Sequence, residues 1–415
     1  MPSPERVLTP DEAARIAADR GFATSAGSAT GRTGIEMEWC TVDLRRPERP
    51  ADFARVRKAA AGAALHHQSR ISFEPGGQIE LSTLALPGLE AVDALADDAH
   101  VLGRSLARAG IGMVAIGLEP GRRRERFVRT PRYDAMEVYF DAGGDAGRTM
   151  MRSTAALQLN VDLGDPSDAD ALAARWDLGH GLGPLLAAMF ANSPFWNGRP
   201  SGWRSTRLAV WSAIDARRTA PVANGVDCRQ AWARYALAAD VMLVRHSDDD
   251  HRPLAPGLSF AEWIERGHPA GWPTVEDLEY HLTTLFPPVR PRGWLELRMI
   301  DAVPRPWWQV AAAIGTVLID DPDASSCAAN AVAPIRGRWN DAARHGLGDP
   351  AFARAARTCT KAALAVLPRN GAAPALVDAA AEFQERFVQR RRTPADELLD
   401  AYERHGTSLP AADNA

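Results

Sequence analysis

The sequence contains only four cysteines, and no two of them form a CxxC pair. It therefore has neither the ligand spacing of a zinc site nor the cysteine framework of a small disulfide-bonded protein. We interpret the cysteines as reduced thiols of a cytosolic protein. They are Cys40, Cys228, Cys327 and Cys359.

Long hydrophobic runs are also lacking. The most apolar stretch, Trp307 to Ile319, is shorter than the roughly 20 residues that a helix needs to cross a bilayer. Met1 to Leu8 contains two prolines and charges of both signs, and no apolar run follows it, so it does not resemble a signal peptide. We therefore expect no membrane association and a cytoplasmic location.

Neither sign of charge predominates. The formal net charge is −4 and the pI is about 6.2, so the chain as a whole does not attract nucleic acid. We interpret the arginines at 122, 123, 124 and 126 as a solvated surface cluster. Hydrophobic residues make up 46% and charged residues 24% of the chain, which indicates a folded soluble protein of one large or two ordinary domains.

Two familiar catalytic motifs are missing. There is no GxxxxGK[ST] loop, which argues against a P-loop nucleotide site, and no GxSxG elbow of the kind that presents a nucleophilic serine. The glycines of Gly110–Met113 favour a turn between a helix and a strand over a dinucleotide site.

Helix signals occur along the whole chain. Thr9 and Glu12 form a capping-box pattern with Pro10 at the first helical position, which predicts a helix that continues through Arg20. Further helices are predicted over 89–109, over 167–190 with Ser167 as its cap and a break at 179–183, and over most of the chain from 307 onward apart from a turn at 320–323.

Four predicted strands, at 34–39, 77–82, 157–162 and 294–298, alternate between apolar and polar residues. In the first of them the period of two places Glu36 and Glu38 on one face and Ile35, Met37 and Trp39 on the other. A further predicted strand covers 111–118. The polar positions of the four alternating strands include Glu36, Glu38, Gln78, Glu80, Ser82, Gln158, Asn160, Glu296 and Arg298.

The polar faces of these strands admit two interpretations. One is an ordinary antiparallel sheet whose polar face meets water. However, a solvated face usually favours lysine and threonine, whereas these strands present mainly glutamate, glutamine and asparagine and no lysine. Carboxylate and amide oxygens are the ligands that Mg²⁺ prefers, and a cation would relieve the repulsion between Glu36 and Glu38. The second interpretation is therefore a Mg-nucleotide site.

Five segments of the chain carry specific motifs: Gly34–Glu38, Phe73–Ser82, Phe190–Phe195, His281–Pro287 and Leu295–Arg298. Together they resemble the glutamate–cysteine ligases, and the branch shared by plants and many bacteria most of all. The resemblance runs in order from about Gly34 to Pro304. The alanine- and arginine-rich composition is most similar to that of the actinobacterial members that supply γ-glutamylcysteine for ergothioneine synthesis.

The resemblance implies an α+β fold like the catalytic part of glutamine synthetase, with a curved, mainly antiparallel sheet and helices on its outer face. It also implies one ligase domain over residues 1–415, with a catalytic sheet core at about 30–305 and a helical region at about 306–405. The funnel-shaped active site is expected on the inner face of the sheet.

The resemblance further implies a role for each site residue. The expected magnesium ligands are Glu36, Glu38, Glu80, Gln158 and Glu296; the nucleotide contacts are Asn160 and Arg298; the substrate contacts are Arg207, Arg152, Thr154, Trp211 and Gln78; and the catalytic residues are Glu38 and Arg298.

Three positions depart from the family pattern. Trp39 stands where the family has a lysine after the glutamate pair, and Leu243 stands where an aromatic residue of the substrate pocket is expected. Arg152 is offset by one place from the arginine expected before the third alternating strand.

The expected activity is the joining of the γ-carboxylate of glutamate to the amino group of cysteine, with ATP as co-substrate and more than one Mg²⁺ ion. Amide formation from a free carboxylate is uphill, so the γ-carboxylate must first be phosphorylated. Two alternatives remain: a ligase that activates glutamate but uses another amine, and a non-catalytic relative that binds nucleotide or metal. The expected partners are small molecules, with no nucleic acid and no membrane.

Overall fold

The computed structural model of the 415-residue chain describes residues 8–23, 30–121, 125–165, 167–223, 227–406 and 409–413. The stretch at 1–7, expected not to be a signal peptide, and the arginines at 122–124 lie outside these residues. Arg126 is described, and its side chain is largely buried against Asp134 and Glu137, so it is not the solvated arginine that the sequence suggested. Within the described ranges, none of the helices is both long and apolar enough to cross a bilayer.

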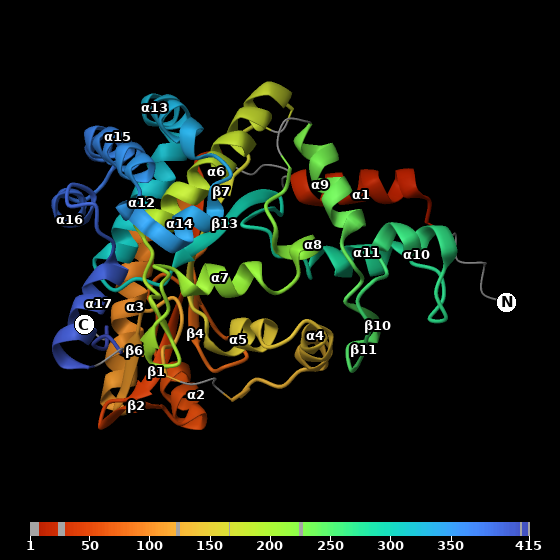
Figure 1. The fold of residues 1–415 in the computed structure, drawn as a ribbon, viewed down its shortest axis with the longest axis horizontal. Coiled ribbons are helices and arrows are strands. Elements are labelled where there is room, and N and C mark those ends of the chain that lie inside the picture. Colours follow the sequence, from red (N-terminus) through yellow and green to blue (C-terminus); the bar gives the residue numbers. More distant parts are fainter. Residues whose placement is uncertain are drawn as a thin grey trace.

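A sheet at the centre of the molecule organises the fold (Figure 1). Its strands run in the order β12-β13-β7-β1-β4-β3, with β2, β5 and β6 also paired to β1, and all of these pairs are antiparallel. The strands are β1 (Arg32–Asp43), β2 (Arg46–Pro50), β3 (Arg70–Phe73), β4 (Ile79–Ser82), β5 (Leu86–Pro87), β6 (Ile111–Val114), β7 (Ala156–Asp162), β12 (Val289–Pro291) and β13 (Trp294–Asp301).

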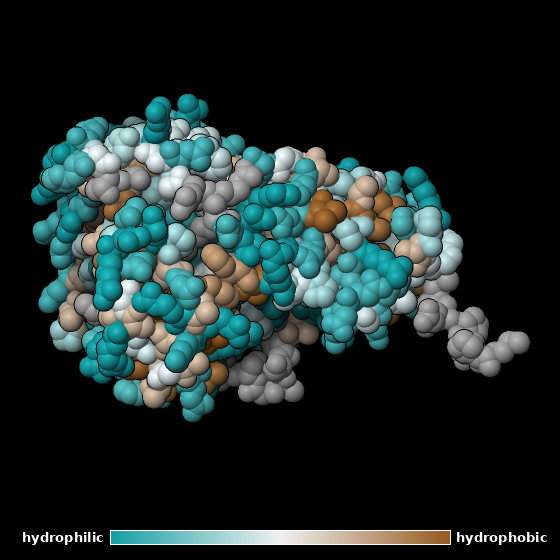
Figure 2. Space-filling model, turned by 90° about the horizontal axis from the view of Figure 1, so that it is seen from below, coloured by the Kyte–Doolittle hydropathy of each residue, from teal (hydrophilic) through white to brown (hydrophobic). Residues whose placement is uncertain are grey.

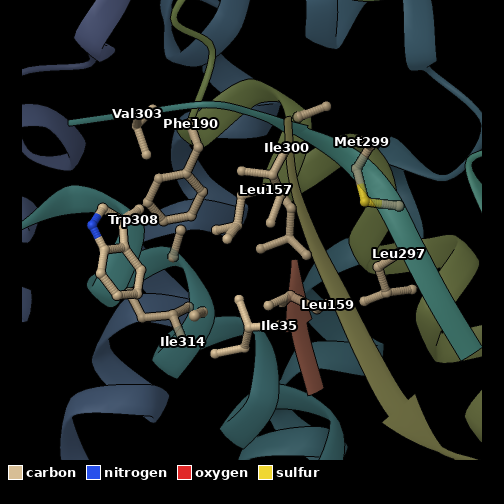
Figure 3. Packing of buried hydrophobic residues seen from close by; sticks show 14 of the residues in the cluster. Ile35, Leu157, Leu159, Phe190, Leu297, Met299, Ile300, Val303, Trp308 and Ile314 are labelled. Carbon is tan, nitrogen blue, oxygen red and sulfur yellow. The ribbon is translucent and has the colours of Figure 1, made fainter. Parts of the chain in front are cut away.

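The apolar face of the sheet is covered by α3 (Glu90–Arg108), α6 (Ala169–Met189) and α12 (Trp307–Asp320). Figure 3 shows how Ile35, Leu159 and Leu297, from three neighbouring strands, point toward Ile314 and Trp308 of α12. These residues belong to one continuous core in which they are almost completely buried, so the alternation in sequence does place one face of each strand inside.

The polar face of the sheet is covered by a second, smaller layer. It consists of α4 (Pro131–Asp141), α5 (Ala146–Ser153) and α7 (Thr206–Ser212), whereas α2 (Phe53–Ala61) packs against α3. A separate apolar cluster, including Met136, Met151 and Phe286, holds much of this layer together. Between this layer and the sheet lies a cavity, which is described below.

One end of the molecule is narrower than the rest (Figures 1 and 2). A third apolar cluster, which includes Ala13, Phe260 and Trp263, forms its interior. The elements there are α1 (Pro10–Phe22), α8 (Ala216–Thr219), α9 (Cys228–Ala238), α10 (Phe260–Arg266), α11 (Val275–Leu282) and the hairpin of β10 (Leu243–Ser247) and β11 (Asp250–Pro253). A short hairpin of β8 (Phe195–Trp196) and β9 (Arg199–Pro200) lies before α7.

The C-terminal helices pack against the body that contains the sheet. The ring centroids of Phe190 and Phe383 are 4.7 Å apart, and both rings lie in the same core as the sheet residues. The amide of Asp413 donates to the carbonyl of Met113 in β6, so the end of the described chain returns to the sheet. The helices are α13 (Pro322–Val332), α14 (Trp339–His345), α15 (Pro350–Val366), α16 (Pro374–Phe383) and α17 (Pro394–His405).

Three expectations about local structure were wrong. The helix expected to break at 179–183 continues without interruption through α6, because its glycines allow close packing: a Cβ on Gly181 would lie 2.7 Å from Val332. Asp168, not Ser167, caps this helix. The strand expected over 111–118 ends at Val114, and Leu118 forms only an isolated bridge with Thr154. The capping box of Thr9 and Glu12 is confirmed.

Candidate active site

A cavity of about 500 Å³ lies between the polar face of the sheet and its covering helices. The side chains that alternate on β1, β4, β7 and β13 enter it, so this polar face lines a cavity and is not an open surface of the molecule. The predicted residues among its lining are Glu36, Glu38, Gln78, Glu80, Thr154, Gln158, Arg207, Trp211, Glu296 and Arg298.

Three glutamates form a compact acidic group. Glu38 of β1 and Glu80 of β4 are paired in register, and Glu74 enters from the turn between β3 and β4. One carboxylate oxygen from each of the three lies within 4.8 Å of the other two. Burial, together with the neighbouring Glu80, raises the pKa of Glu74 to about 8, and burial next to Glu74 raises the pKa of Glu38. Three carboxylates held this close form a site that favours a cation.

Amide groups fix the orientation of Glu36 and Glu38. The side chain of Asn160 donates to Glu36 Oε1 at 2.9 Å, and the backbone amide of Ala156 donates to Glu38 Oε2 at 2.9 Å. Gln158 lies between them in register with Glu36. Burial, with Glu296 and Glu80 nearby, raises the pKa of Glu36 to about 7. The carboxylates therefore have defined positions before any ligand binds.

Arginines gather at the β12–β13 side of the cavity. Glu296, which is 1% exposed, accepts from Arg290 through both of its oxygens at 2.6 and 2.9 Å, and also from Arg292 and Arg298. Burial opposes ionisation of Glu296, but these arginines, led by Arg290, hold the pKa of its carboxyl far below the usual range. Arg298 also donates to Gln158 Oε1 at 2.6 Å. Acidic and basic groups thus lie side by side. The acidic groups suit a cation, and the basic groups suit an anionic phosphate bound next to it.

Arg207 lies near the opposite end of β13. It projects from the start of α7, is 3% exposed, and donates to the carbonyl of Arg298 at 2.7 Å. Asp301 faces it at 3.5 Å, and hydrogen bonds from Ser193 and Ser205 hold that carboxylate in place. A buried guanidinium fixed in this way is suited to hold the carboxylate of a substrate.

The helices that cover the cavity contribute an apolar wall. Trp211 of α7 is held by a hydrogen bond from its indole nitrogen to the carbonyl of Phe286, and the guanidinium of Arg298 lies 5.6 Å from the centre of its ring. Phe286 also belongs to this wall, together with three methionines: Met136 from α4, and Met150 and Met151 from α5. Sulfur and aromatic side chains therefore form one side of an otherwise polar cavity.

Residues 32–413 match the model of the glutamate–cysteine ligase family 2. The chain belongs to this family.

Relatives in the glutamate–cysteine ligase family support the expected branch. The chain is 42% identical over 378 residues to the glutamate–cysteine ligase EgtA of Mycolicibacterium smegmatis, which covers 89% of this chain and 87% of that protein. It is 41% identical over 384 residues to the EgtA of Mycobacterium tuberculosis, with 89% and 86% covered. The chloroplastic glutamate–cysteine ligase of Arabidopsis thaliana is 32% identical over 283 residues, which are 66% of this chain and 52% of that one. The resemblance to glutamate–cysteine ligases seen in the sequence is confirmed.

Two solved structures share the fold of this glutamate–cysteine ligase family member. The glutamate–cysteine ligase of Francisella tularensis, in complex with AMP, has a TM-score of 0.54 at 13% identity and covers 91% of this chain and 86% of that one. A bifunctional glutathione synthetase from Pasteurella multocida has a TM-score of 0.51 at 16% identity, with 97% and 52% covered. The expected α+β class, with an antiparallel sheet and outer helices, is confirmed.

Two predicted site residues of the ligase do not line the cavity. Asn160 lies at its edge, where its side chain bonds to Glu36 and accepts from the indole of Trp294. Arg152 pairs with Glu137 of α4, outside the cavity, and a role in substrate binding stays a prediction for it. Two of the residues that depart from the family pattern also lie outside the cavity. Trp39 is buried on the opposite face of β1, and Leu243 is buried behind the apolar wall.

Sequence reasoning missed several residues of the ligase cavity. Glu74 belongs to the segment Phe73–Ser82, but it lies in a turn, where the alternation of a strand does not predict which way a side chain points. Arg290 faces Glu296 across the β12–β13 pair, and it was overlooked because β12 is only three residues long. Tyr133 and the three methionines come from helices whose faces cannot be placed without the tertiary structure.

Proposed function

We propose that this chain catalyses the ATP-dependent joining of the γ-carboxylate of glutamate to the amino group of cysteine, and that the product enters ergothioneine synthesis. The observation that supports this most is the acidic group of Glu38, Glu74 and Glu80 beside the arginines around Glu296. Such a pairing suits Mg²⁺ and the phosphates of ATP bound next to each other. EgtA proteins of the two mycobacteria, with over 40% identity, support the choice of substrates and pathway.

The acidic group fits magnesium. Its donors are hard carboxylate oxygens, and ionising all three together is unfavourable without a cation, as the raised pKa of Glu74 indicates. Glu38, Glu74 and Glu80 would hold one ion, and Glu36 with Gln158 could contribute to a second. Bound Mg²⁺ would neutralise charge on the phosphates and on the γ-carboxylate.

The residues of the chain account for the remaining requirements. Arg207 would hold the glutamate at the Asp301 end of the cavity. Thr154 and Gln78 line the same cavity, and the Gln78 side chain donates to the carbonyl of Thr154. Arg298 would place its charge where the phosphoryl group moves from ATP to the γ-carboxylate. Attack by the amine on the resulting γ-glutamyl phosphate then forms the amide and releases phosphate.

Release of ADP and phosphate tests this reaction. It should require glutamate, cysteine and a divalent cation together, and it should stop on addition of EDTA. With oxygen-18 in the γ-carboxylate of glutamate, label should appear in the released phosphate. Label confined to the amide, or release of pyrophosphate, would show a different chemistry.

The apolar wall of Trp211, Phe286, Met136, Met150 and Met151 supports cysteine as the amine. Sulfur makes mildly favourable contacts with aromatic rings and with other sulfur-containing side chains, so this wall suits a small thiol. A pocket separates side chains that differ by one small group by only about 10- to 200-fold, so serine, alanine and 2-aminobutyrate should react slowly.

Competition among these amines at equal concentration tests the choice. Cysteine should have the largest kcat/KM, and γ-glutamylcysteine should be the main product by mass. A clear preference for another amine would replace cysteine in the proposal and leave the phosphoryl chemistry unchanged. We also propose a cytoplasmic location, which the four cysteines support because all of them are thiols rather than disulfides.

A further inference from the structure

A second, smaller cavity of about 250 Å³ adjoins the mouth of the active-site cavity. It lies where the C-terminal end of α1 and the helix α11 meet the β12–β13 hairpin, and it shares Thr283, Arg292 and Trp294 with the larger cavity. The two cavities are therefore neighbouring compartments with a common wall.

Two glycines allow the hairpin to approach α1 this closely. A Cβ on Gly21 would lie 3.2 Å from Pro291 of β12, as well as 2.8 Å from the indole of Trp232 in α9, and Gly293, at φ +81°, would place a Cβ 2.6 Å from the carbonyl of Ala23. The backbone amide of Gly293 donates to the carbonyl of Gly21 at 2.7 Å. The position of Trp294, the next residue, is thus fixed by the backbone contact that forms the floor of the small cavity.

Trp294 is a large aromatic side chain that remains 37% exposed at this shared wall. Its indole nitrogen donates to Asn160 Oδ1 at 2.9 Å, and Asn160 in turn donates to Glu36 at 2.9 Å. The guanidinium of Arg292 lies 5.4 Å from the centre of the indole and also reaches Glu296 at 3.2 Å. Direct contacts therefore connect the ring to both the acidic and the basic groups of the active site.

Glu279 of α11 supplies a polar group in the same small cavity. Arg20 donates to its Oε1, at 2.7 Å from Nε, and within the described part of the chain Oε2 has no hydrogen-bond partner. A carboxylate oxygen with a free lone pair can accept a hydrogen bond from an amino group, whereas it repels a carbonyl oxygen. The cavity thus combines an aromatic surface with a hydrogen-bond acceptor.

We propose that the small cavity holds the purine base of the nucleotide substrate, with Trp294 as its stacking surface and Glu279 Oε2 as the acceptor for the exocyclic amino group of adenine. This inference rests on the proposed use of ATP and extends it to base selection. The phosphates extend from the base past Asn160 toward Arg298 and the acidic group. Guanine places a carbonyl oxygen where adenine has its amino group, so Glu279 disfavours GTP.

Binding of AMP, measured by calorimetry, tests the stacking surface without any turnover. Stacking of a base on an aromatic side chain contributes about 1–3 kcal/mol, so Trp294→Ala should weaken AMP binding by about 5- to 150-fold. Trp294→Phe keeps a ring and should recover most of the affinity. Trp272→Ala is the matched control, because this tryptophan is 50% exposed at the same end of the molecule and lines neither cavity. In turnover, Trp294→Ala should raise the KM for ATP and leave the KM for glutamate unchanged.

Base selectivity tests Glu279. Glu279→Gln keeps the size and the bond from Arg20 but presents a donor to the base, so the ratio of kcat/KM for ATP to that for GTP should fall about tenfold or more. AMP binding unaffected by Trp294→Ala, or a selectivity ratio unchanged in Glu279→Gln, would overturn the proposal. These experiments test base binding separately from the proposed reaction. If the wild-type protein bound AMP through Trp294 but formed no γ-glutamyl product, only the proposed reaction would be contradicted.

Discussion

Single charged residues decide how the active site responds to substitution and pH. The acidic group of Glu38, Glu74 and Glu80 lies beside the arginines around Glu296, but within the described part of the chain none of its three carboxylates forms an ion pair with an arginine. A carboxylate in this group therefore has a role that an amide of the same size cannot take over.

Replacing Glu38 by Gln should lower turnover by about 10²–10⁴-fold, because loss of one charged ligand removes several kcal/mol of stabilisation from the reacting phosphate and carboxylate. The midpoint of thermal unfolding should not fall, since the variant has less repulsion. Steady-state release of phosphate measures the effect. Glu403→Gln, at an exposed position of α17, is the matched control and should match the wild type. If Glu38→Gln turned over at a rate near that of the wild type, Glu38 would not be a metal ligand, and β1 would be an ordinary strand with one polar face.

The raised pKa values of Glu36 (about 7) and Glu74 (about 8) predict that the metal-free protein loses stability as pH rises. Between the ordinary value of about 4.5 and these values, the folded state holds protons that the unfolded state has released. Stability therefore falls by about 1.4 kcal/mol per pH unit for each group across that window, and the loss is complete above about pH 8.

Thermal unfolding between about pH 5 and about pH 8, with EDTA or with Mg²⁺, measures this slope. Magnesium should remove most of it, because a bound cation favours the ionised carboxylates. Glu36→Gln should reduce the slope in EDTA. A slope that is the same with and without Mg²⁺ would argue against metal binding by this group.

The strand period predicted the direction of the site residues on β1, β4, β7 and β13, because alternation is fixed by backbone geometry alone. The turn that carries Glu74 has no such period. Gly76 in that turn lies against the carbonyl of Arg152, a contact between segments far apart in the sequence, and only the folded chain reveals it. Local pattern therefore predicted the cavity residues on the strands, whereas those on turns and helices depend on tertiary packing.

At the scale of the elements, glycines in α6 were mistaken for a break. A glycine signals either a bend or a close contact, and the sequence does not distinguish the two. In α6, Gly183 lies directly against the ring of Trp339 from α14. The glycine-rich stretch is therefore the contact between two helices.

Gly183→Ala should consequently destabilise the protein by about 1–2 kcal/mol, although alanine favours helix formation, because the added methyl group collides with the indole. The shift in the denaturant midpoint measures this change. Gly348→Ala is the control: a Cβ there meets no atom of the described chain within 4 Å, and the change should stay within about 0.5 kcal/mol. Stabilisation by Gly183→Ala would mean that α6 and α14 are farther apart than described.

At the scale of the whole molecule, we propose that residues 1–415 form one cooperative unit. The core of the sheet continues without interruption into the C-terminal helices, as the contact between Phe190 and Phe383 shows, and Arg204 pairs with Asp396 at 2.7 Å across the same boundary. A division at about residue 305 would expose this shared apolar surface to water.

Calorimetry should therefore show one unfolding transition, with equal calorimetric and van't Hoff enthalpies. A chain that ends at residue 305 should fail to give a cooperative transition, since it lacks α12 on the apolar face of the sheet. Two separate transitions in the full chain, or a folded fragment, would show that the sheet core and the helical region are independent domains.

The strand order also governs how the site comes together during synthesis. β1 pairs with β7, and β7 pairs with β13, whose first residue follows the end of β1 by about 250 residues. At roughly 5–20 residues per second, the ribosome takes about 13–50 s to make that interval. The strands that carry Glu36, Glu38 and Glu80 thus emerge well before the hairpin that carries Arg290 and Arg298. For that interval the nascent chain holds the acidic half of its active site without the basic half.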